Sequence, residues 1–217
     1  MSGMDAEDFA QVKAAVRQLV REAVLPREEE IDLHDRIPDE LRSAAADMGL
    51  FGYALPEEHG GLGVTMSEDV QLAFEFGYTT PAFRSLFGTN NGIAGQVIAR
   101  FGSEEQKKAY LPRLAAGELI GSFALTEAEA GSDPAGLRTH ARRDGDGWVI
   151  TGGKRYITNA PIADLFVVFA RSDPAEKGGR GISSFVVDAT APGVTVGPHD
   201  KKMGLSLIHI SEPTRPY

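Results

Sequence analysis

The sequence predicts an α+β protein, with an N-terminal all-helical domain followed by a small antiparallel β-barrel or sandwich domain. Before about Gly121 the apolar residues recur at three- and four-residue spacing, which is typical of helices that bury one face. After it, short apolar and β-branched runs alternate with glycine-rich turns, which is typical of a barrel or sandwich. We therefore divide the chain into a helical domain (1–120), a β domain (121–205) and a tail (206–217).

Local signals predict five helical segments in the first domain. Between the second and third, the stretch 56–63 contains three glycines but lacks the full dinucleotide fingerprint and follows no strand, so we interpret it as a packing loop. The predicted helices cover 5–24, closed by Pro26; 38–48, stopped by Gly49; 67–78, burying Val70 and Phe74; 82–101, interrupted near Asn90, Asn91 and Gly92; and 104–114, opened by a capping box of Ser103 and Gln106.

Turn residues divide the second domain into short strands. The run Asp144-Gly145-Asp146-Gly147 predicts a tight hairpin, and Gly152-Gly153 predicts a second turn. A continuous apolar run at 165–170 suits a buried strand. Together the predicted strands cover 139–141, 148–151, 154–158, 165–170, 182–187 and 194–196.

Composition excludes several classes of protein. The formal net charge of -9 disfavours a nucleic-acid partner. The absence of cysteine excludes disulfides, thiol catalysis and zinc–thiolate sites, and the five histidines show no ligand spacing, so we expect no metal site. No run of 18 apolar residues predicts a membrane span, and the N-terminus does not resemble a secretory signal, so we expect a cytoplasmic protein.

A segment of small and polar residues follows the first predicted strand, from Phe123 to Gly136. Its glycines, including Gly131, let a backbone approach a ligand closely, and Thr126 and Ser132 offer hydroxyl donors. Such a loop suits a polar ring edge or a pyrophosphate, although an ordinary strand-to-loop turn has the same composition. Two glutamates in this loop, Glu127 and Glu129, look like paired carboxylates, but we do not expect them to be acid–base catalysts.

A second segment, Arg155 to Asn159, ends a hairpin strand. Alternation places Tyr156 and Thr158 on one face and Ile157 on the other. An aromatic ring beside a hydroxyl could cover and hydrogen-bond a flat heterocycle, and a half-buried strand end is the alternative.

Together the two segments resemble the acyl-CoA dehydrogenase family. The family motif aliphatic-Thr-Glu-x-x-x-Gly-Ser-Asp is matched by Leu125 to Asp133, and its Gly-x-Lys hairpin and aromatic-Ile-Thr-Asn segment by Gly152 to Asn159. The stretch from Phe101 to Glu118 is also typical of the family's helical domain. The resemblance covers residues 5–205.

The resemblance implies an FAD site on the β domain. Thr126 would bind the pyrimidine side of the flavin ring, and Thr158 would bind N5, the atom that accepts hydride. Tyr156 would pack near the flavin face, and Ser132 would reach the FAD pyrophosphate or the pantetheine end of acyl-CoA. The implied cofactor-binding residues are Phe123, Leu125, Thr126, Gly131, Ser132, Tyr156, Ile157 and Thr158, with Ser132 also binding substrate.

The implied function is FAD-dependent oxidation of acyl-CoA thioesters to trans-2-enoyl-CoA. The family's catalytic glutamate lies on a C-terminal helical domain, so we expect this chain to be an inactive N-terminal fragment without a catalytic residue. The resemblance also implies electron-transfer flavoprotein as electron acceptor and a homo-oligomeric full-length enzyme.

The tail from Ser206 to Tyr217 matches nothing expected in the family, and it resembles translated sequencing-adapter sequence. Our hypothesis is that it is artefactual. Two other functions stay open: an acyl-CoA oxidase or flavin monooxygenase of the same fold, and a non-catalytic binding or interaction protein.

Overall fold

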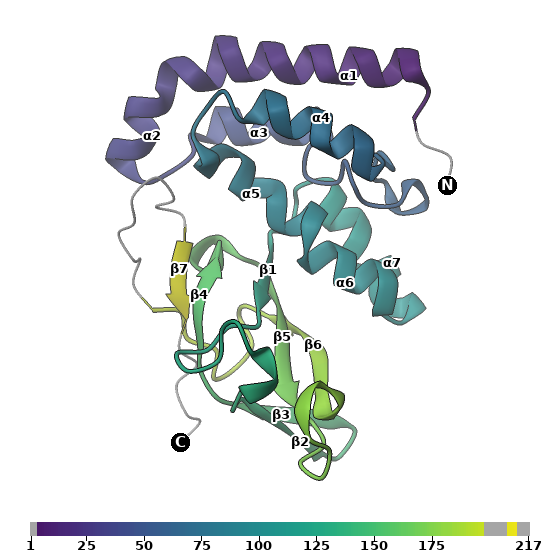
Figure 1. Cartoon of the computed structure of the whole chain (residues 1–217), viewed down its shortest axis with the longest axis vertical. Helices are drawn as coiled ribbons and strands as arrows, with labels where there is room; N and C mark the ends of the chain where they lie inside the picture. Colours follow the sequence, from purple (N-terminus) through teal and green to yellow (C-terminus); the bar gives the residue numbers. More distant parts are fainter. Residues whose placement is uncertain (1–3, 198–207, 212–217) are drawn as a thin grey trace. The chain divides into compact units, whose positions relative to one another are not determined.

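The computed structural model describes residues 4–197 and 208–211, which form two compact units (Figure 1). The α unit comprises residues 4–120, and the β unit comprises residues 121–197 and 208–211. A helical region followed by a sheet confirms the predicted fold class.

The α unit contains seven described α-helices, and two of them begin with a capping box. Ser103 and Gln106 form the predicted box, and Thr65 forms another with Glu68. The predicted interruption after Asn91 is also confirmed, because Ile93 leaves helical geometry with a φ of -132°. The helices are α1 (Ala6–Gln18), α2 (Glu28–His34), α3 (Asp39–Asp47), α4 (Met66–Phe76), α5 (Pro81–Gly92), α6 (Ala94–Phe101) and α7 (Glu104–Ala115).

The prediction that the first helix closes at Pro26 is wrong. From α1 the chain continues through a π-helical segment, Leu19–Val24, and a 3₁₀ turn, Leu25–Arg27, into α2. Proline lacks an N–H donor, and the change of hydrogen-bond pattern around it lets the helical path continue.

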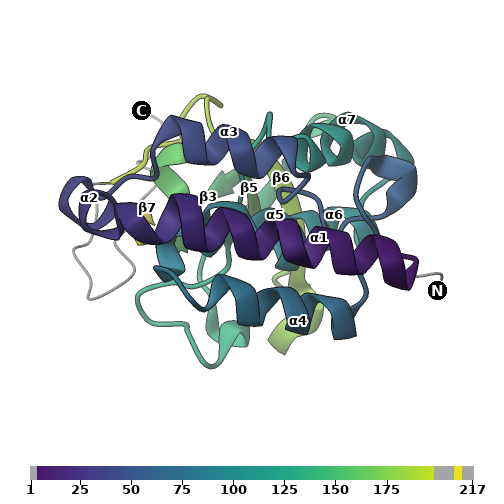
Figure 2. The ribbon, with the colours of Figure 1, turned by 90° about the horizontal axis from the view of Figure 1, so that it is seen from above.

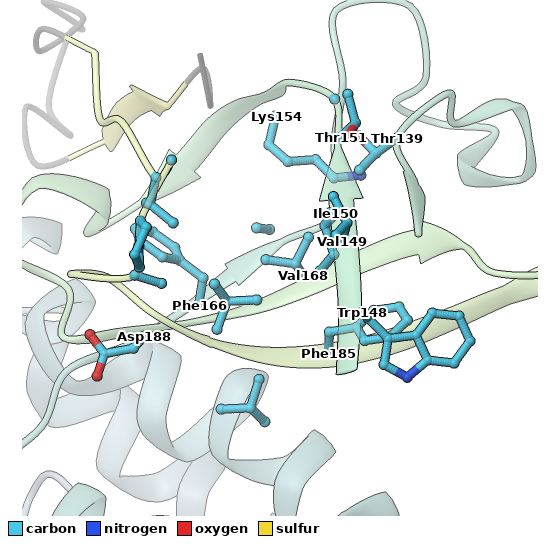
Figure 3. A pocket seen from close by; sticks show the side chains of 18 of the residues that line it. Thr139, Trp148, Val149, Ile150, Thr151, Lys154, Phe166, Val168, Phe185 and Asp188 are labelled. Carbon is cyan, nitrogen blue, oxygen red and sulfur yellow. The ribbon is translucent and has the colours of Figure 1, made fainter. Parts of the chain in front are cut away.

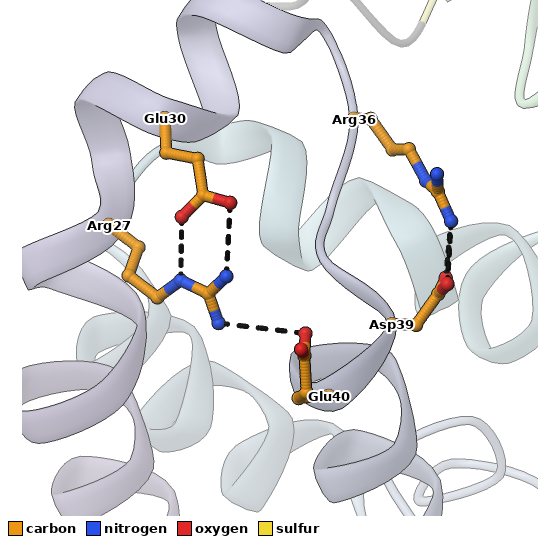
Figure 4. Close-up of polar contacts among 5 residues, drawn as sticks. All are labelled: Arg27, Glu30, Arg36, Asp39 and Glu40. Atoms are coloured by element: carbon orange, nitrogen blue, oxygen red, sulfur yellow. Dashed lines mark hydrogen bonds and ion pairs between the residues drawn. The ribbon is translucent and has the colours of Figure 1, made fainter.

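Arg27 connects α2 to α3 at the end of this path. Its guanidinium donates two hydrogen bonds to Glu30, at 2.8 and 3.0 Å, and lies 3.7 Å from Glu40 on α3 (Figure 4). Nearby, Arg36 pairs with Asp39 in the first turn of α3 at 2.6 Å. These ion pairs stabilise a connection that has few buried apolar residues of its own.

Helix α4 faces the core with residues other than those predicted. Val70 and Phe74 are 50% and 72% exposed, whereas Leu72 and Phe76 are buried. Glu75 shares the buried face because α1 lies beside α4 (Figure 2), and Arg17 on α1 pairs with its carboxylate at 2.6 Å. A charged residue can occupy a buried position when a partner neutralises it, so periodicity alone assigns the wrong face.

The core of the α unit is an aromatic cluster around Phe87. Ring centroids of four neighbours lie 5.3 to 6.3 Å from that of Phe87, and all five residues are at most 3% exposed. Edge-to-face contacts of this kind add to the stabilisation from apolar burial. The four neighbours are Phe51, Tyr53, Phe76 and Phe83.

The glycine-rich loop between α3 and α4 packs tightly, as predicted. A Cβ added at Gly61 would collide with the carbonyl oxygen of Leu55. Gly63 has a φ of +64°, which residues with a side chain rarely adopt. These glycines are therefore explained by packing.

The sheet of the β unit is open and mixed, which differs from the predicted antiparallel barrel. Strand β5 pairs in parallel with β1 and antiparallel with β6, and β2 forms the predicted antiparallel hairpin with β3. The connection from β1 to β5 is long enough to return the chain in the same direction, whereas tight turns require antiparallel neighbours. The strands of this sheet are β1 (Gly121–Ala124), β2 (His140–Asp144), β3 (Gly147–Thr151), β5 (Leu165–Arg171) and β6 (Ile182–Asp188).

A second, two-stranded sheet pairs β4 (Lys154–Thr158) antiparallel with β7 (Ile208–Ser211). Strand β7 belongs to the tail predicted to be artefactual, and the rest of that tail lies outside the described residues. The strand predicted at 194–196 is wrong, because this stretch is irregular and follows the turns at 189–193 without a strand partner among the described residues.

Candidate functional site

The first predicted segment begins on β1 and continues as an irregular loop. Phe123 is half-buried, and its ring lies 4.9 Å from that of Phe169 on β5. Leu125 and Thr126 follow the strand and are also partly exposed, and the loop then carries Gly131 and Ser132 into solvent. The parallel pairing of β1 with β5 therefore fixes the start of the segment and leaves its end accessible.

The second predicted segment lies on β4, where the backbone is irregular. Tyr156 and Asn159 have φ values of 58° and 65°, in the left-handed region that costs non-glycine residues on the order of 1 kcal/mol or more. The register of β4 shifts between Lys154 and Ile157. This bulge leaves the Tyr156 ring 47% exposed and directs Ile157 into the apolar cluster of the β unit.

The structure brings these two segments side by side. The backbone N–H of Arg155 donates to the carbonyl oxygen of Thr126 at 2.8 Å. The hydroxyl of Ser122 on β1 donates to the carbonyl oxygen of Thr158. Residues about 30 positions apart in the sequence therefore form one continuous surface.

The predicted hydroxyl donors are available on this surface. Thr126 and Thr158 are partly exposed and Ser132 is exposed, and no described residue forms a hydrogen bond with any of the three hydroxyls. A Cβ added at Gly131 would meet nothing within 4 Å. The surface thus offers accessible hydroxyl donors, open space at Gly131 and the exposed ring of Tyr156. These features suit a flat ligand with a polar edge, such as a flavin. Ile157, being buried, offers such a ligand only its backbone.

The two glutamates of the loop have different partners. Glu129 is exposed and pairs with Arg138 at 2.7 Å. Glu127 is buried, and its carboxylate lies 2.8 Å from Nζ of Lys154. The two carboxylates therefore have separate partners and do not form a pair.

Lys154 is the main residue that the sequence analysis missed. It is only 3% exposed, and charged side chains are rarely buried unless they are paired. The available signal was a lysine at the start of a short strand directly after Gly152-Gly153, which gives no indication of burial.

A cavity of about 910 Å³ lies elsewhere in the β unit (Figure 3). Its walls are mostly apolar and include Phe166, Val168 and Phe185, and Thr139, Thr151 and Lys154 gather at one end. None of the eight predicted cofactor-binding residues lines it. The cavity and the surface formed by the two segments are therefore separate candidate sites.

Among the described residues, no group of three or more acidic or histidine side chains is suited to hold a metal ion. No described helix combines the length and apolar character that crossing a bilayer requires.

Comparisons with known proteins match both units. Residues 6–118 match the N-terminal domain model of the acyl-CoA dehydrogenases, and residues 122–214 match the middle domain model. A probable acyl-CoA dehydrogenase of Bacillus subtilis is 39% identical over 92% of this chain and 34% of its own length. An NADH-dependent acryloyl-CoA reductase of Anaerotignum propionicum is 37% identical over 90% of this chain and 50% of its own length.

A solved structure matches as well. The glutaryl-CoA dehydrogenase of Mycobacterium smegmatis in complex with FADH2 superimposes with a TM-score of 0.83 and 36% identity, over 96% of this chain and 52% of the other. This chain thus spans between a third and about half of the length of these relatives.

Proposed function

We propose, from the premise that this chain belongs to the acyl-CoA dehydrogenase family, that it supplies the β-domain wall of an FAD site. The reaction we propose for the whole enzyme is the oxidation of acyl-CoA thioesters to trans-2-enoyl-CoA. The observation that carries the proposal is the hydrogen bond from Arg155 N–H to the Thr126 carbonyl oxygen, which joins the two predicted flavin segments.

Three hydroxyls would orient the cofactor. Thr126 would bind the pyrimidine side of the flavin ring, Thr158 would bind N5, and Ser132 would bind the pyrophosphate or the pantetheine of acyl-CoA. Two observations support these roles: the three side chains are at least partly exposed, and their hydroxyls have no hydrogen-bond partner among the described residues. When bound, FAD would supply the redox chemistry by accepting hydride.

We assign no catalytic base to this chain. Both glutamates of the loop are held in ion pairs, Glu127 with Lys154 and Glu129 with Arg138. We therefore expect the 217-residue chain to bind FAD weakly and to turn over no acyl-CoA. Its acyl-CoA substrate, an electron-transfer flavoprotein acceptor, homo-oligomer formation and a cytoplasmic location remain predictions.

A titration with FAD, followed by flavin fluorescence, tests the proposal. We expect saturable binding that Thr158→Val weakens about tenfold, because one hydrogen bond to the ring is lost. Thr151→Val is the matched control, since Thr151 is a partly buried strand threonine that lines the separate cavity. A loss of affinity with the control variant alone would place the flavin in the cavity and contradict the assignment.

Activity measurements separate the related functions. Robust acyl-CoA-dependent dye reduction by this chain would refute the expectation of inactivity. Peroxide formation during substrate oxidation would favour an oxidase or monooxygenase. Because one relative is named a reductase, oxidation of a reduced dye by enoyl-CoA tests the reverse direction. A chain that binds no flavin would favour a non-catalytic binding protein.

A further inference from the structure

The buried Glu127–Lys154 ion pair joins the two segments that form the proposed flavin surface, and Lys154 also lines one end of the cavity. The residues are 27 positions apart, and their side chains are 9% and 3% exposed. Removing two charges from water is unfavourable, and Coulombic attraction compensates for it only when the geometry and the additional hydrogen bonds are good. An apolar pair of similar volume would fill the same space without that cost, so stability alone is a weak explanation for this pair.

Each charged group makes further hydrogen bonds, and these reach three stretches of chain. Nζ of Lys154 also donates to the carbonyl oxygen of Leu125 at 3.0 Å. The Glu127 carboxylate accepts the backbone N–H of Arg138 at 2.6 Å and that of Thr139 at 3.0 Å. The pair therefore connects the loop after β1, the approach to β2 and the start of β4.

The residues next to this pair are the proposed flavin ligands. Thr126 lies between Leu125 and Glu127, and Arg155, whose N–H donates to Thr126, follows Lys154. At the other end of the surface, Ser122 binds the carbonyl oxygen of Thr158. These two hydrogen bonds hold the backbone at Thr126 and at Thr158, so we expect the distance between the two hydroxyls to be fixed.

The protonation states agree with an acceptor that is charged at neutral pH. Burial raises the pKa of the Glu127 carboxyl, but the backbone N–H groups of Arg138 and Thr139 and the ammonium of Lys154 outweigh it, so the pKa lies below its usual range. Burial lowers the pKa of Lys154, and Glu127 opposes that change. Glu127 is thus ionised at neutral pH and accepts all three donors.

We propose that Glu127 and Lys154 are positioning residues, which hold the two flavin segments in register without touching the flavin. This inference rests on the proposed function. It differs from a purely structural role in one respect: the geometry of the flavin surface, and not only the stability of the β unit, depends on the charged pair.

The test compares four forms of the 217-residue chain: wild type, Lys154→Met, Glu127→Gln and the double variant. Each is titrated with FAD, and its melting temperature is followed by Trp148 fluorescence. We expect the Lys154→Met variant to melt lower and to bind FAD at least tenfold more weakly, since Glu127 is left buried without its partner. The double variant should regain part of the melting temperature, because no buried charge is left unpaired, and none of the FAD affinity.

The double variant distinguishes a positioning role of the ion pair from a purely structural one. If FAD affinity returns together with the melting temperature, the pair is merely structural and the proposal is overturned. Arg17→Met is the matched control, because it breaks the Arg17–Glu75 pair in the α unit. We expect it to lower the melting temperature of the helices and to leave FAD affinity unchanged.

Amide hydrogen exchange distinguishes this inference from the function on which it rests. If the wild-type chain does not bind FAD, the proposed function fails, and exchange at Arg155 still tests the pair. Faster exchange of this amide in Lys154→Met, with unchanged exchange in the β5–β6 ladder, supports a local positioning role. Unchanged exchange at Arg155 overturns it.

Discussion

The two units of this chain enclose their apolar side chains to different degrees. In the α unit, Phe87 is surrounded by four aromatic rings and is completely buried. In the β unit, Phe166 packs with small residues such as Ala124 and Ala160, and it also lines the cavity. The aromatic core of the α unit is thus fully enclosed, whereas Phe166 of the β unit borders a cavity. The proposed flavin surface belongs to the less enclosed unit, in agreement with the tendency of ligand sites to lie in less stable regions.

Separate probes can follow the two units. Trp148 is the single tryptophan of the chain and contacts Phe185 in the β unit, with ring centroids 5.4 Å apart. Circular dichroism at the helical minimum reports mainly on the α unit, which contains all seven described α-helices.

The largest expected effect comes from removing the centre of the aromatic cluster. Phe87→Ala should lower the free energy of unfolding of the α unit by about 3–5 kcal/mol, because the lost apolar contacts leave a cavity. Phe166→Ala in the β unit should cost about half as much, since Phe166 lines the cavity and packs with smaller residues. Equal losses, measured by denaturant unfolding with both probes, would contradict the comparison.

Polar connections also occur in the α unit, and Asn91 is the clearest. Its side chain accepts the N–H of Ala54 at 2.8 Å and donates to the carbonyl oxygens of Leu50 and Phe87 at 2.7 and 3.0 Å. Asn91→Ala should cost about 2–3 kcal/mol, because buried backbone groups lose their partners. Gln96→Ala is the control: it removes one half-buried bond, to the Ala54 carbonyl oxygen, and should cost about 1 kcal/mol.

Acidification should affect each unit through a buried carboxylate, Glu75 in the α unit and Glu127 in the β unit. Hydrogen bonds from Arg17 lower the pKa of Glu75, and the donors to Glu127 lower its pKa despite burial. Both folded-state pKa values therefore lie below that of an unfolded glutamate, about 4.3. Each carboxylate stabilises the fold above that pH, and its contribution is lost as the pH falls through the folded-state pKa.

Matched variants separate the two carboxylates. Glu127→Gln should flatten the acid dependence of the Trp148 signal, and Glu75→Gln should flatten that of the helical signal. Melting curves between pH 7 and pH 3 measure both. If either variant changed both signals equally, the units would not respond independently to acid.

The features predicted correctly from the sequence are those encoded locally. The Ser103–Gln106 capping box, the turn at Gly145 and the end of α5 before Ile93 each depend on a few neighbouring residues. The two flavin segments were identified from motifs, and their juxtaposition was implied only by the family resemblance. Local chemistry thus predicts some element boundaries, although not the one at Pro26, and spatial arrangement requires more.

The failed predictions depend on contacts between distant residues. Phe74 is exposed because Arg17 lets Glu75 occupy the buried face of α4. The backbone of Tyr156 has a positive φ at a bulge in the pairing of β4 with β7, and β7 was not predicted. Burial of Lys154 depends on Glu127, 27 residues earlier. Single-residue patterns carry no information about such pairs.

The smallest expected effect on stability, and the sharpest test of the flavin surface, comes from Gly131→Ala. Neither Gly131 nor Gly136 has a positive φ, and a Cβ at either would meet nothing within 4 Å. Both alanine variants should therefore keep the free energy of unfolding within about 0.5 kcal/mol of wild type.

FAD affinity should nevertheless differ between these two variants. If the ligand approaches the backbone at Gly131 closely, an added methyl group there should weaken binding about tenfold, or about 1.4 kcal/mol. Gly136→Ala should bind FAD as wild type does, because Gly136 is not among the residues for which the family resemblance implies a cofactor contact. The affinity is measured by fluorescence titration. Because protein packing does not require a glycine at position 131, a loss of affinity in Gly131→Ala would be explained by a clash with the ligand. Equal affinities of the two variants would show that Gly131 is not part of the site.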